Sequence, residues 1–151
     1  MHVAIESPDQ QKVIQLIAAL DQYQDSLYPA ESRYALDLDS LKQDHVRFAV
    51  ARDGGGAAIG CGAILLGAEY GELKRMYVAE SSRGKGVAGA MLALIESEAR
   101  QSGCTVVTLE SGPYQPEALK FYASHGFQRR GPYGDYPDDP LSVFMQKVLG
   151  Q

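Results

Sequence analysis

Apolar residues recur every three or four positions in several segments, which predicts helices. The first begins at the sequence SPDQ (7–10), whose serine and proline suit an N-cap and a first helical position, and it ends before Pro29. Asp37 is expected to cap a short second helix. The third starts at Val87 with one buried apolar stripe, and Gly103 ends it.

Strand-like runs lie between these helices. Strands are predicted at 2–6, 46–52, 57–66, 71–78, 106–109 and 141–148, and a fourth helix at 116–124. The sequence DGGGA joins two of the strands as a flexible hairpin turn. The expected order is β-α-α-β-β-β-α-β-α-β-β, with an antiparallel meander and one parallel βαβ unit. These features predict an α/β fold in which a mixed sheet has helices on both faces, as a single domain over 1–151.

Composition narrows the class of protein. With 45% hydrophobic and 22% charged residues, the chain is typical of a soluble globular domain. A net charge of −5 argues against nucleic acid as a partner, and no apolar run is long enough for a membrane span. The N-terminus lacks signal-peptide features, and Cys61 and Cys104 form no C-x-x-C motif, so we expect a cytoplasmic protein with reduced thiols.

A glycine-rich stretch, SSRGKGVAGAML (81–92), follows a predicted strand and opens a helix. Its glycines spell G-x-G-x-x-G, and Glu110 lies where a dinucleotide-binding fold has its ribose-binding acid. Against that interpretation, AESSR separates the strand from the first glycine, and too few residues follow for a second nucleotide-binding half. The alternatives are a pyrophosphate held at a helix N-terminus, helped by Arg75, Arg83 and Lys85, or a turn with solvated basic residues.

Two motifs resemble those of the GNAT (Gcn5-related N-acetyltransferase) superfamily. The signature [Q/R]-x-x-G-x-[G/A] matches RGKGVA (83–88), and N-x-x-A-x-x-[L/F]-Y-x-x-x-G-F matches residues 115–127, with Gln115 in place of asparagine. The segments LYPAESRYALD and GDYPDDPLSVFM are similar to those of a subgroup of small bacterial members. The resemblance implies a twisted, mostly antiparallel sheet of about six or seven strands, with one splayed parallel pair.

The resemblance also implies acetyl-CoA as co-substrate, with its pyrophosphate on the glycine loop and its pantetheine arm along the end of the strand before it. The residues assigned to coenzyme binding in this way are Met76, Tyr77, Val78, Arg83, Gly84, Lys85, Gly86, Val87, Ala88 and Gln115. In such a site a backbone N–H near Val78 would polarise the thioester carbonyl.

Three side chains are candidates for proton transfer. By the resemblance, Tyr122 is the general acid that protonates the leaving thiolate, and Glu72 is the first choice for the base. Glu110, acting through a water molecule, is the second choice. The structural alternatives are a packed aromatic residue for Tyr122 and a salt-bridged or solvated carboxylate for each glutamate, with Arg75 as a partner.

By the same resemblance, two segments shape the acceptor pocket. Tyr28, Glu31 and Ser32 lie on the first, and Tyr133 and Asp135 on the second, although an acidic aromatic surface loop is an equal alternative. No histidine has metal-ligand spacing, so no metal is expected.

We expect acetyl transfer to a primary amine, on a small molecule first. The alternatives are a protein or peptide acceptor, a CoA-binding regulatory module without turnover, and a dinucleotide oxidoreductase. Homodimers are common in the family, so a homodimer is an expected assembly.

Overall fold

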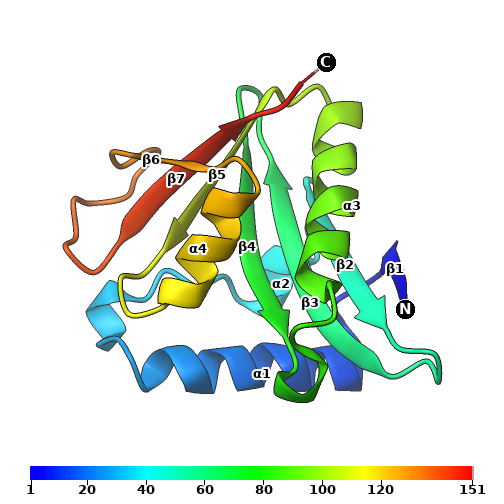
Figure 1. The fold of residues 1–151 in the computed structure, drawn as a ribbon. Coiled ribbons are helices and arrows are strands. Elements are labelled where there is room, and N and C mark those ends of the chain that lie inside the picture. Colours follow the sequence, from blue (N-terminus) through cyan, green and yellow to red (C-terminus); the bar gives the residue numbers. More distant parts are fainter. Residues whose placement is uncertain (151) are drawn as a thin grey trace.

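In the computed structural model, which describes residues 1–150, the strands form one sheet in the order β1-β2-β3-β4-β5-β7-β6 (Figure 1). The strands are β1 (His2–Ile5), β2 (Val46–Arg52), β3 (Ala58–Leu66), β4 (Gly71–Val78), β5 (Val106–Ser111), β6 (Gln128–Arg130) and β7 (Val143–Val148). The helices are α1 (Gln11–Asp25), α2 (Leu38–Leu41), α3 (Val87–Gln101) and α4 (Pro116–Ser124), with short 3-10 turns at Ala30–Ser32 and Glu80–Ser82. The predicted order of elements is confirmed. It includes β6, the strand that this order places between the helix at 116–124 and the last strand.

Local sequence signals place most helix ends correctly, with one exception. Asp37 caps α2 as expected, because its Oδ1 accepts a hydrogen bond of 2.9 Å from the amide of Ser40. The predicted start of α1 at Ser7 is wrong. The Ser7 hydroxyl instead accepts a hydrogen bond from the amide of Asp9 in a separate turn, and the helix begins only at Gln11. The side-chain amide of Gln10 stabilises this turn by donating to the carbonyl of Ser7.

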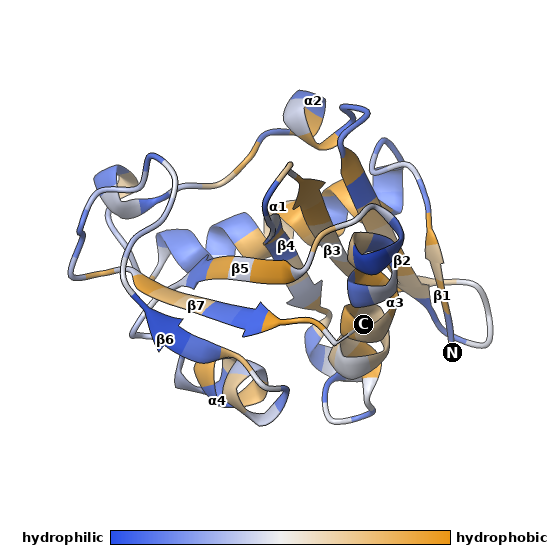
Figure 2. Ribbon diagram, turned by 90° about the horizontal axis from the view of Figure 1, so that it is seen from above, coloured by the Kyte–Doolittle hydropathy of each residue, from blue (hydrophilic) through white to orange (hydrophobic). Residues whose placement is uncertain are grey.

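Helices cover both faces of the sheet, as predicted (Figure 2). α3 and α4 pack on one face through a core that includes Leu92, Ile95 and Tyr122. α1 and α2 pack on the other face, where Val13 and Leu41 are almost completely buried. The sheet is therefore the middle layer of three, and any opening through it joins the two helical layers.

The only parallel pair among the described strands, β4 and β5, separates after three residues (Figure 1). Gly71 to Leu73 pair with Val107 to Leu109, and beyond this point the two strands diverge. On its other edge β4 pairs with β3 through a bulge at Arg75, whose φ of 59° lies in the left-handed region. The splayed parallel pair predicted from the resemblance is present.

Arg75 is held away from the glycine-rich stretch. Its guanidinium donates to Asp21 on α1 at 2.5 Å and to the carbonyl of Leu36 at 2.9 Å. The same Asp21 accepts a hydrogen bond of 2.9 Å from Arg33. The expectation that Arg75 joins Arg83 and Lys85 around one anion, or pairs with a candidate base, is therefore wrong.

Both cysteines are buried and unpaired, as predicted. The Cys61 thiol donates to the carbonyl of Arg75 at 3.4 Å, and the Cys104 thiol donates to the carbonyl of Gly67 at 3.6 Å. Burial raises the pKa of Cys61 to about 12. In residues 1–150, no helix has the length and apolar character needed to cross a membrane.

Candidate active site

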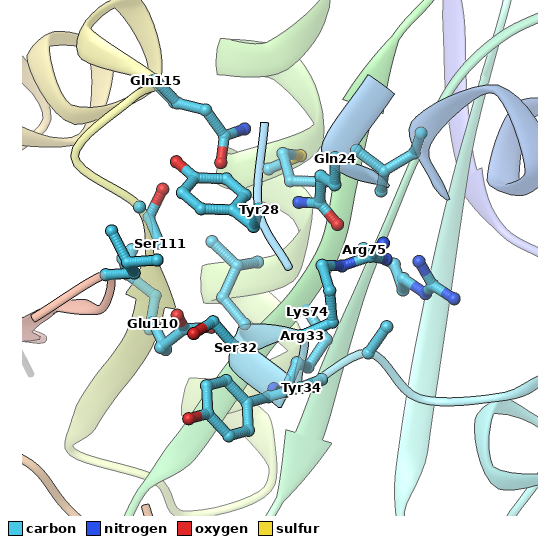
Figure 3. A pocket seen from close by; sticks show the side chains of 18 of the residues that line it. Gln24, Tyr28, Ser32, Arg33, Tyr34, Lys74, Arg75, Glu110, Ser111 and Gln115 are labelled. Carbon is cyan, nitrogen blue, oxygen red and sulfur yellow. Dashed lines mark hydrogen bonds between the residues drawn. The ribbon is translucent and has the colours of Figure 1, made fainter. Parts of the chain in front are cut away.

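A cavity of about 100 Å³ lies where β4 and β5 diverge (Figure 3). Its walls come from the end of α1 and the following loop, from both strands, and from the start of α4. Among the lining residues are Tyr28, Ser32, Glu110, Gln115 and Tyr122. Together with Met76, six of the predicted site residues, from four parts of the sequence, therefore meet in one cavity. We call it the central cavity.

A groove of about 460 Å³ adjoins the central cavity. It follows the end of β4 to the glycine loop, and its lining includes Met76, Tyr77, Val78, Arg83, Gly84, Ala88 and Gln115. The groove and the central cavity share Leu20, Met76, Gln115, Ala118 and Tyr122. A ligand in the groove can thus present one end to the central cavity.

The glycine loop has the backbone geometry of an anion site. Gly84 and Gly86 have φ angles of 77° and 79°, in the left-handed region that glycine tolerates. Gly86 is the N-cap of α3, so the amides of Val87, Ala88 and the next residue have no acceptor inside the helix. Such amides and the helix dipole favour a phosphate, and the exposed Lys85 adds a positive charge. These residues fit a coenzyme diphosphate.

Arg83 is positioned at the junction of this loop and β4. Its Nε donates to the carbonyl of Val78 at 3.0 Å, and its guanidinium lies 5.5 Å from the centre of the Tyr77 ring. The arginine therefore lies over the half-buried end of β4 and lines the groove, where a negatively charged ligand would meet it.

Tyr122 lies on α4 at the boundary between the groove and the central cavity. Its ring packs edge-to-face against Phe121 and Phe127, with centroids 5.3 and 5.6 Å away. Within the described chain its hydroxyl has no hydrogen-bond partner. Burial raises the pKa of Tyr122, which keeps the hydroxyl protonated. The residue is a packed aromatic and also carries a free proton donor.

Glu110 is the carboxylate that faces the central cavity, close to Ser32 (Figure 3). Burial raises the pKa of Glu110 to about 7. The Ser142 hydroxyl and the ammonium of Lys74 act to lower this pKa, whereas the nearby negative charges of Glu72 and Asp139 act to raise it. A carboxyl group with this pKa exchanges its proton at neutral pH, as a general base must.

Glu72 has a different environment from the one expected of a base. It accepts hydrogen bonds from the hydroxyls of Tyr133 at 3.0 Å and Tyr136 at 2.5 Å, and the ammonium of Lys74 lies 3.3 Å away. It lines a second pocket beside the central cavity, together with Tyr133 and Asp135. Glu31 is exposed and lines neither pocket nor groove. Among the predicted site residues, one group thus lines the central cavity and groove, a second lines the neighbouring pocket, and Glu31 lies outside both.

Sequence reasoning missed several lining residues, among them Gln24, Lys74 and Gly112. Gln24 had a signal: it lies four residues after Leu20 and four before Tyr28, so a polar side chain interrupts an apolar helix stripe. Gly112 had none. A Cβ there would lie 1.9 Å from the hydroxyl oxygen of Tyr28, so the close approach of that ring requires glycine.

Tyr28 closes one side of the central cavity. Its hydroxyl accepts a hydrogen bond of 3.1 Å from the amide of Tyr114, and the two rings stack with centroids 5.4 Å apart. Within residues 1–150 no three acidic, histidine or cysteine side chains converge as metal ligands would.

Comparison with known proteins gives consistent results. The family model described as the acetyltransferase (GNAT) family matches residues 13–127. The chain is 48% identical to a protein of Azospirillum brasilense named IAA acetyltransferase, over 97% of each chain. It is 37% identical to the uncharacterized N-acetyltransferase YsnE of Bacillus subtilis, over 99% of this chain and 100% of that one. A crystal structure from Klebsiella pneumoniae, assigned to the acyl-CoA N-acyltransferases, has a TM-score of 0.88 at 37% identity, covering 99% and 97% of the two chains.

Proposed function

The chain belongs to the acetyltransferase (GNAT) family, whose members use acetyl-CoA, and we propose that it acetylates a primary amine of a small molecule. The observation that carries this proposal is the meeting of groove and central cavity at Tyr122, with Glu110 facing the cavity. One space suits the coenzyme, the other suits the amine, and the two join where proton transfer is needed.

The coenzyme would be held by main chain more than by side chains. The amides of residues 84–88 would bind its diphosphate, with Lys85 and Arg83 adding charge. Beyond Leu73, β4 has no partner on the side of β5, so the backbone of Met76 to Val78 is free to pair with the pantetheine arm. Acetyl-CoA supplies an acetyl group activated as a thioester.

Glu110 is the base that we propose, in preference to Glu72. An ammonium is not a nucleophile, so the acceptor must lose a proton before it attacks. Glu110 faces the central cavity with a pKa of about 7, whereas Glu72 is occupied by two tyrosine hydroxyls and a lysine. A base matched to neutral pH contributes about 10²–10⁴-fold to the rate.

Tyr122 is the acid in this proposal. Its protonated, unpartnered hydroxyl lies between the groove and the central cavity, where it can donate to the sulfur that leaves. Holding both reactants across this junction supplies a further advantage of about 7–11 kcal/mol at most. In this proposal the chain therefore aligns the two reactants, removes a proton from the acceptor through Glu110 and donates a proton to the leaving thiolate through Tyr122.

The acceptor is proposed to be small because the central cavity is only about 100 Å³ and is bounded on one side by the loop after α1. The name of the Azospirillum relative, IAA acetyltransferase, also supports a small-molecule acceptor.

The test is coenzyme binding followed by turnover. Calorimetry should show acetyl-CoA binding, and thiol release should follow with members of a panel of small amines. Binding without turnover against amines, amino acids and peptides would support a regulatory module instead, and turnover with peptides alone would support a protein acetyltransferase. No heat with acetyl-CoA would reject the proposal.

A further inference from the structure

A second pocket, of about 400 Å³, adjoins the central cavity on the α1 side of β4. We call it the tyrosine pocket, because its lining is dominated by Tyr34, Tyr70, Tyr133 and Tyr136, with Leu36, Leu65 and Pro137 completing the walls. Tyr34 and Lys74 line both the tyrosine pocket and the central cavity. The two spaces are therefore neighbours that share one wall.

The buried polar groups in the tyrosine pocket already bind each other. Glu72 accepts hydrogen bonds from Tyr133 and Tyr136 and pairs with Lys74. The ammonium of Lys74 also donates to the carbonyl of Tyr34 at 2.9 Å and to the hydroxyl of Tyr136. The side chains of Lys74 and Glu72 are only 10% and 16% exposed. A ligand would meet this pair as a neutralised unit and gain little by binding to it.

Apart from the exposed carboxylate of Asp135, the surface left for a ligand is aromatic and apolar. The tyrosine rings pack edge-to-face, with Tyr133 and Tyr136 centroids 5.2 Å apart and Tyr70 and Tyr133 centroids 5.6 Å apart. Tyr133 is buried with the guanidinium of Arg130 5.5 Å from its ring centre, and Lys74 lies over the Tyr136 ring, so the ring surface that a ligand can reach belongs mainly to the half-buried Tyr34 and Tyr70. Aromatic ligands bind well against such rings. The alkyl side chains of Leu36 and Leu65 complete an apolar wall.

The position of the tyrosine pocket relative to Glu110 suggests which molecule enters it. Glu72 and Lys74 are two residues apart on β4, a separation of about 6–7 Å along the strand. An acceptor whose amine lies beside Glu110 would pass Lys74 and Tyr34, which line both spaces, to reach the tyrosine pocket. A spacer of a few carbon atoms would then place a ring among the tyrosines.

We propose that the tyrosine pocket is the outer half of the acceptor site and receives an aromatic ring, so that the preferred acceptors are arylalkylamines. This inference rests on the proposed function and specifies its substrate class. Glu72 then has a positioning role: it ties the loop that carries Tyr133 and Tyr136 to β4 and so builds the ring-binding wall.

A homologous series of amines tests the inference. Benzylamine, 2-phenylethylamine, 3-phenylpropylamine and 4-phenylbutylamine are compared with unbranched alkylamines of the same spacer length, by kcat/KM for thiol release. The expected result is a rise along the phenyl series to a preference of about tenfold or more over the matched alkylamine, since ring burial gains free energy of that order.

Substitutions in the tyrosine pocket test whether its lining residues cause the phenyl preference. Tyr70→Ala should remove most of the phenyl preference and leave the alkylamines within about twofold, because Tyr70 lines only the tyrosine pocket. Tyr70→Phe keeps the ring and should behave as the wild type. Leu65→Ala, on the adjacent wall, is the second variant in case Tyr70→Ala does not fold.

Two outcomes would overturn the inference: phenyl and alkyl amines of equal kcat/KM in the wild type, or a Tyr70→Ala variant that slows both series equally. If none of these amines is turned over, calorimetry with CoA-saturated protein decides, and 4-phenylbutylamine must bind more tightly than butylamine. Acetylation of amines without any ring preference would reject this inference and leave the proposed function standing. Failure to bind acetyl-CoA would reject the proposed function itself.

Discussion

Replacing Glu110 with glutamine tests both the chemistry of the site and its effect on stability. Burial raises the pKa of Glu110 from its usual 4.5 to about 7. If the ionised carboxylate is the base, kcat/KM should fall about tenfold per pH unit below pH 7. The acceptor should be an amine whose own ammonium has a pKa well above this pH range, so that the acceptor stays protonated throughout and only Glu110 shapes the profile. Glu110→Gln should lose this acidic limb and about 10²–10⁴-fold in rate at neutral pH.

The same substitution should stabilise the folded protein at high pH. Below the unfolded-state pKa of 4.5 the carboxyl is protonated in both states, and its burial has no ionisation cost. Between there and about pH 7 the folded state retains a proton that the unfolded state has released, so the wild type loses stability as pH rises. At about 1.4 kcal/mol per pH unit, the full loss is about 3 kcal/mol above pH 7.

Glutamine carries no charge, so the variant should exceed the wild type by up to about 3 kcal/mol near pH 8 and match it near pH 4 in denaturant titrations. The matched control is Glu72→Gln, which should keep the acidic limb because its carboxylate already binds two tyrosines. An acidic limb that survives in Glu110→Gln, or a stability difference that does not depend on pH, would refute the reasoning.

Three further substitutions examine other parts of the site. Tyr122→Phe removes the one proton donor at the junction and should lower kcat about 10²-fold or more, while calorimetry gives an unchanged acetyl-CoA affinity; full activity would exclude Tyr122 as the acid. Gly86→Ala forces a side chain into a left-handed conformation at a cost of about 1–2 kcal/mol, and it should weaken acetyl-CoA binding. The control is Gly131→Ala, which also lies in open space but has no positive φ, and its acetyl-CoA affinity should equal that of the wild type. Gly112→Ala places a Cβ 1.9 Å from the Tyr28 hydroxyl oxygen. Thermal melts should therefore show that the free energy of unfolding falls by about 1–3 kcal/mol, and the KM for the acceptor should rise. Wild-type values of both would mean that the Tyr28 ring moves freely.

Features determined by neighbouring residues were predictable from the sequence. The cap at Asp37, the hairpin turn after Arg52 and the glycines before α3 depend on backbone preferences that a few residues carry. The resemblance added the splayed pair, which is a feature of the family and is not indicated by local sequence signals. The start of α1 was misplaced because a local turn at Ser7 satisfies the same sequence pattern as an N-cap.

The choice between the two glutamates was not predictable, because it depends on contacts between distant segments. Glu72 and Glu110 both lie on central strands near the point of divergence, with similar local sequence signals. The loop carrying Tyr133 and Tyr136 returns over β4 more than sixty positions later and binds Glu72, which leaves Glu110 facing the cavity. In the same way Arg75 pairs with Asp21, 54 positions away, and so leaves the glycine loop.

The burial of both cysteines has a practical consequence for work on this protein. Every turnover of acetyl transfer would liberate a coenzyme thiol, which coloured thiol reagents detect. Because Cys61 and Cys104 are enclosed, and Cys61 is also held in its unreactive protonated form, the folded chain should contribute almost no background to such a readout. The colour that develops would count released coenzyme alone, and a sudden extra signal of two equivalents per chain would report that the sample has unfolded.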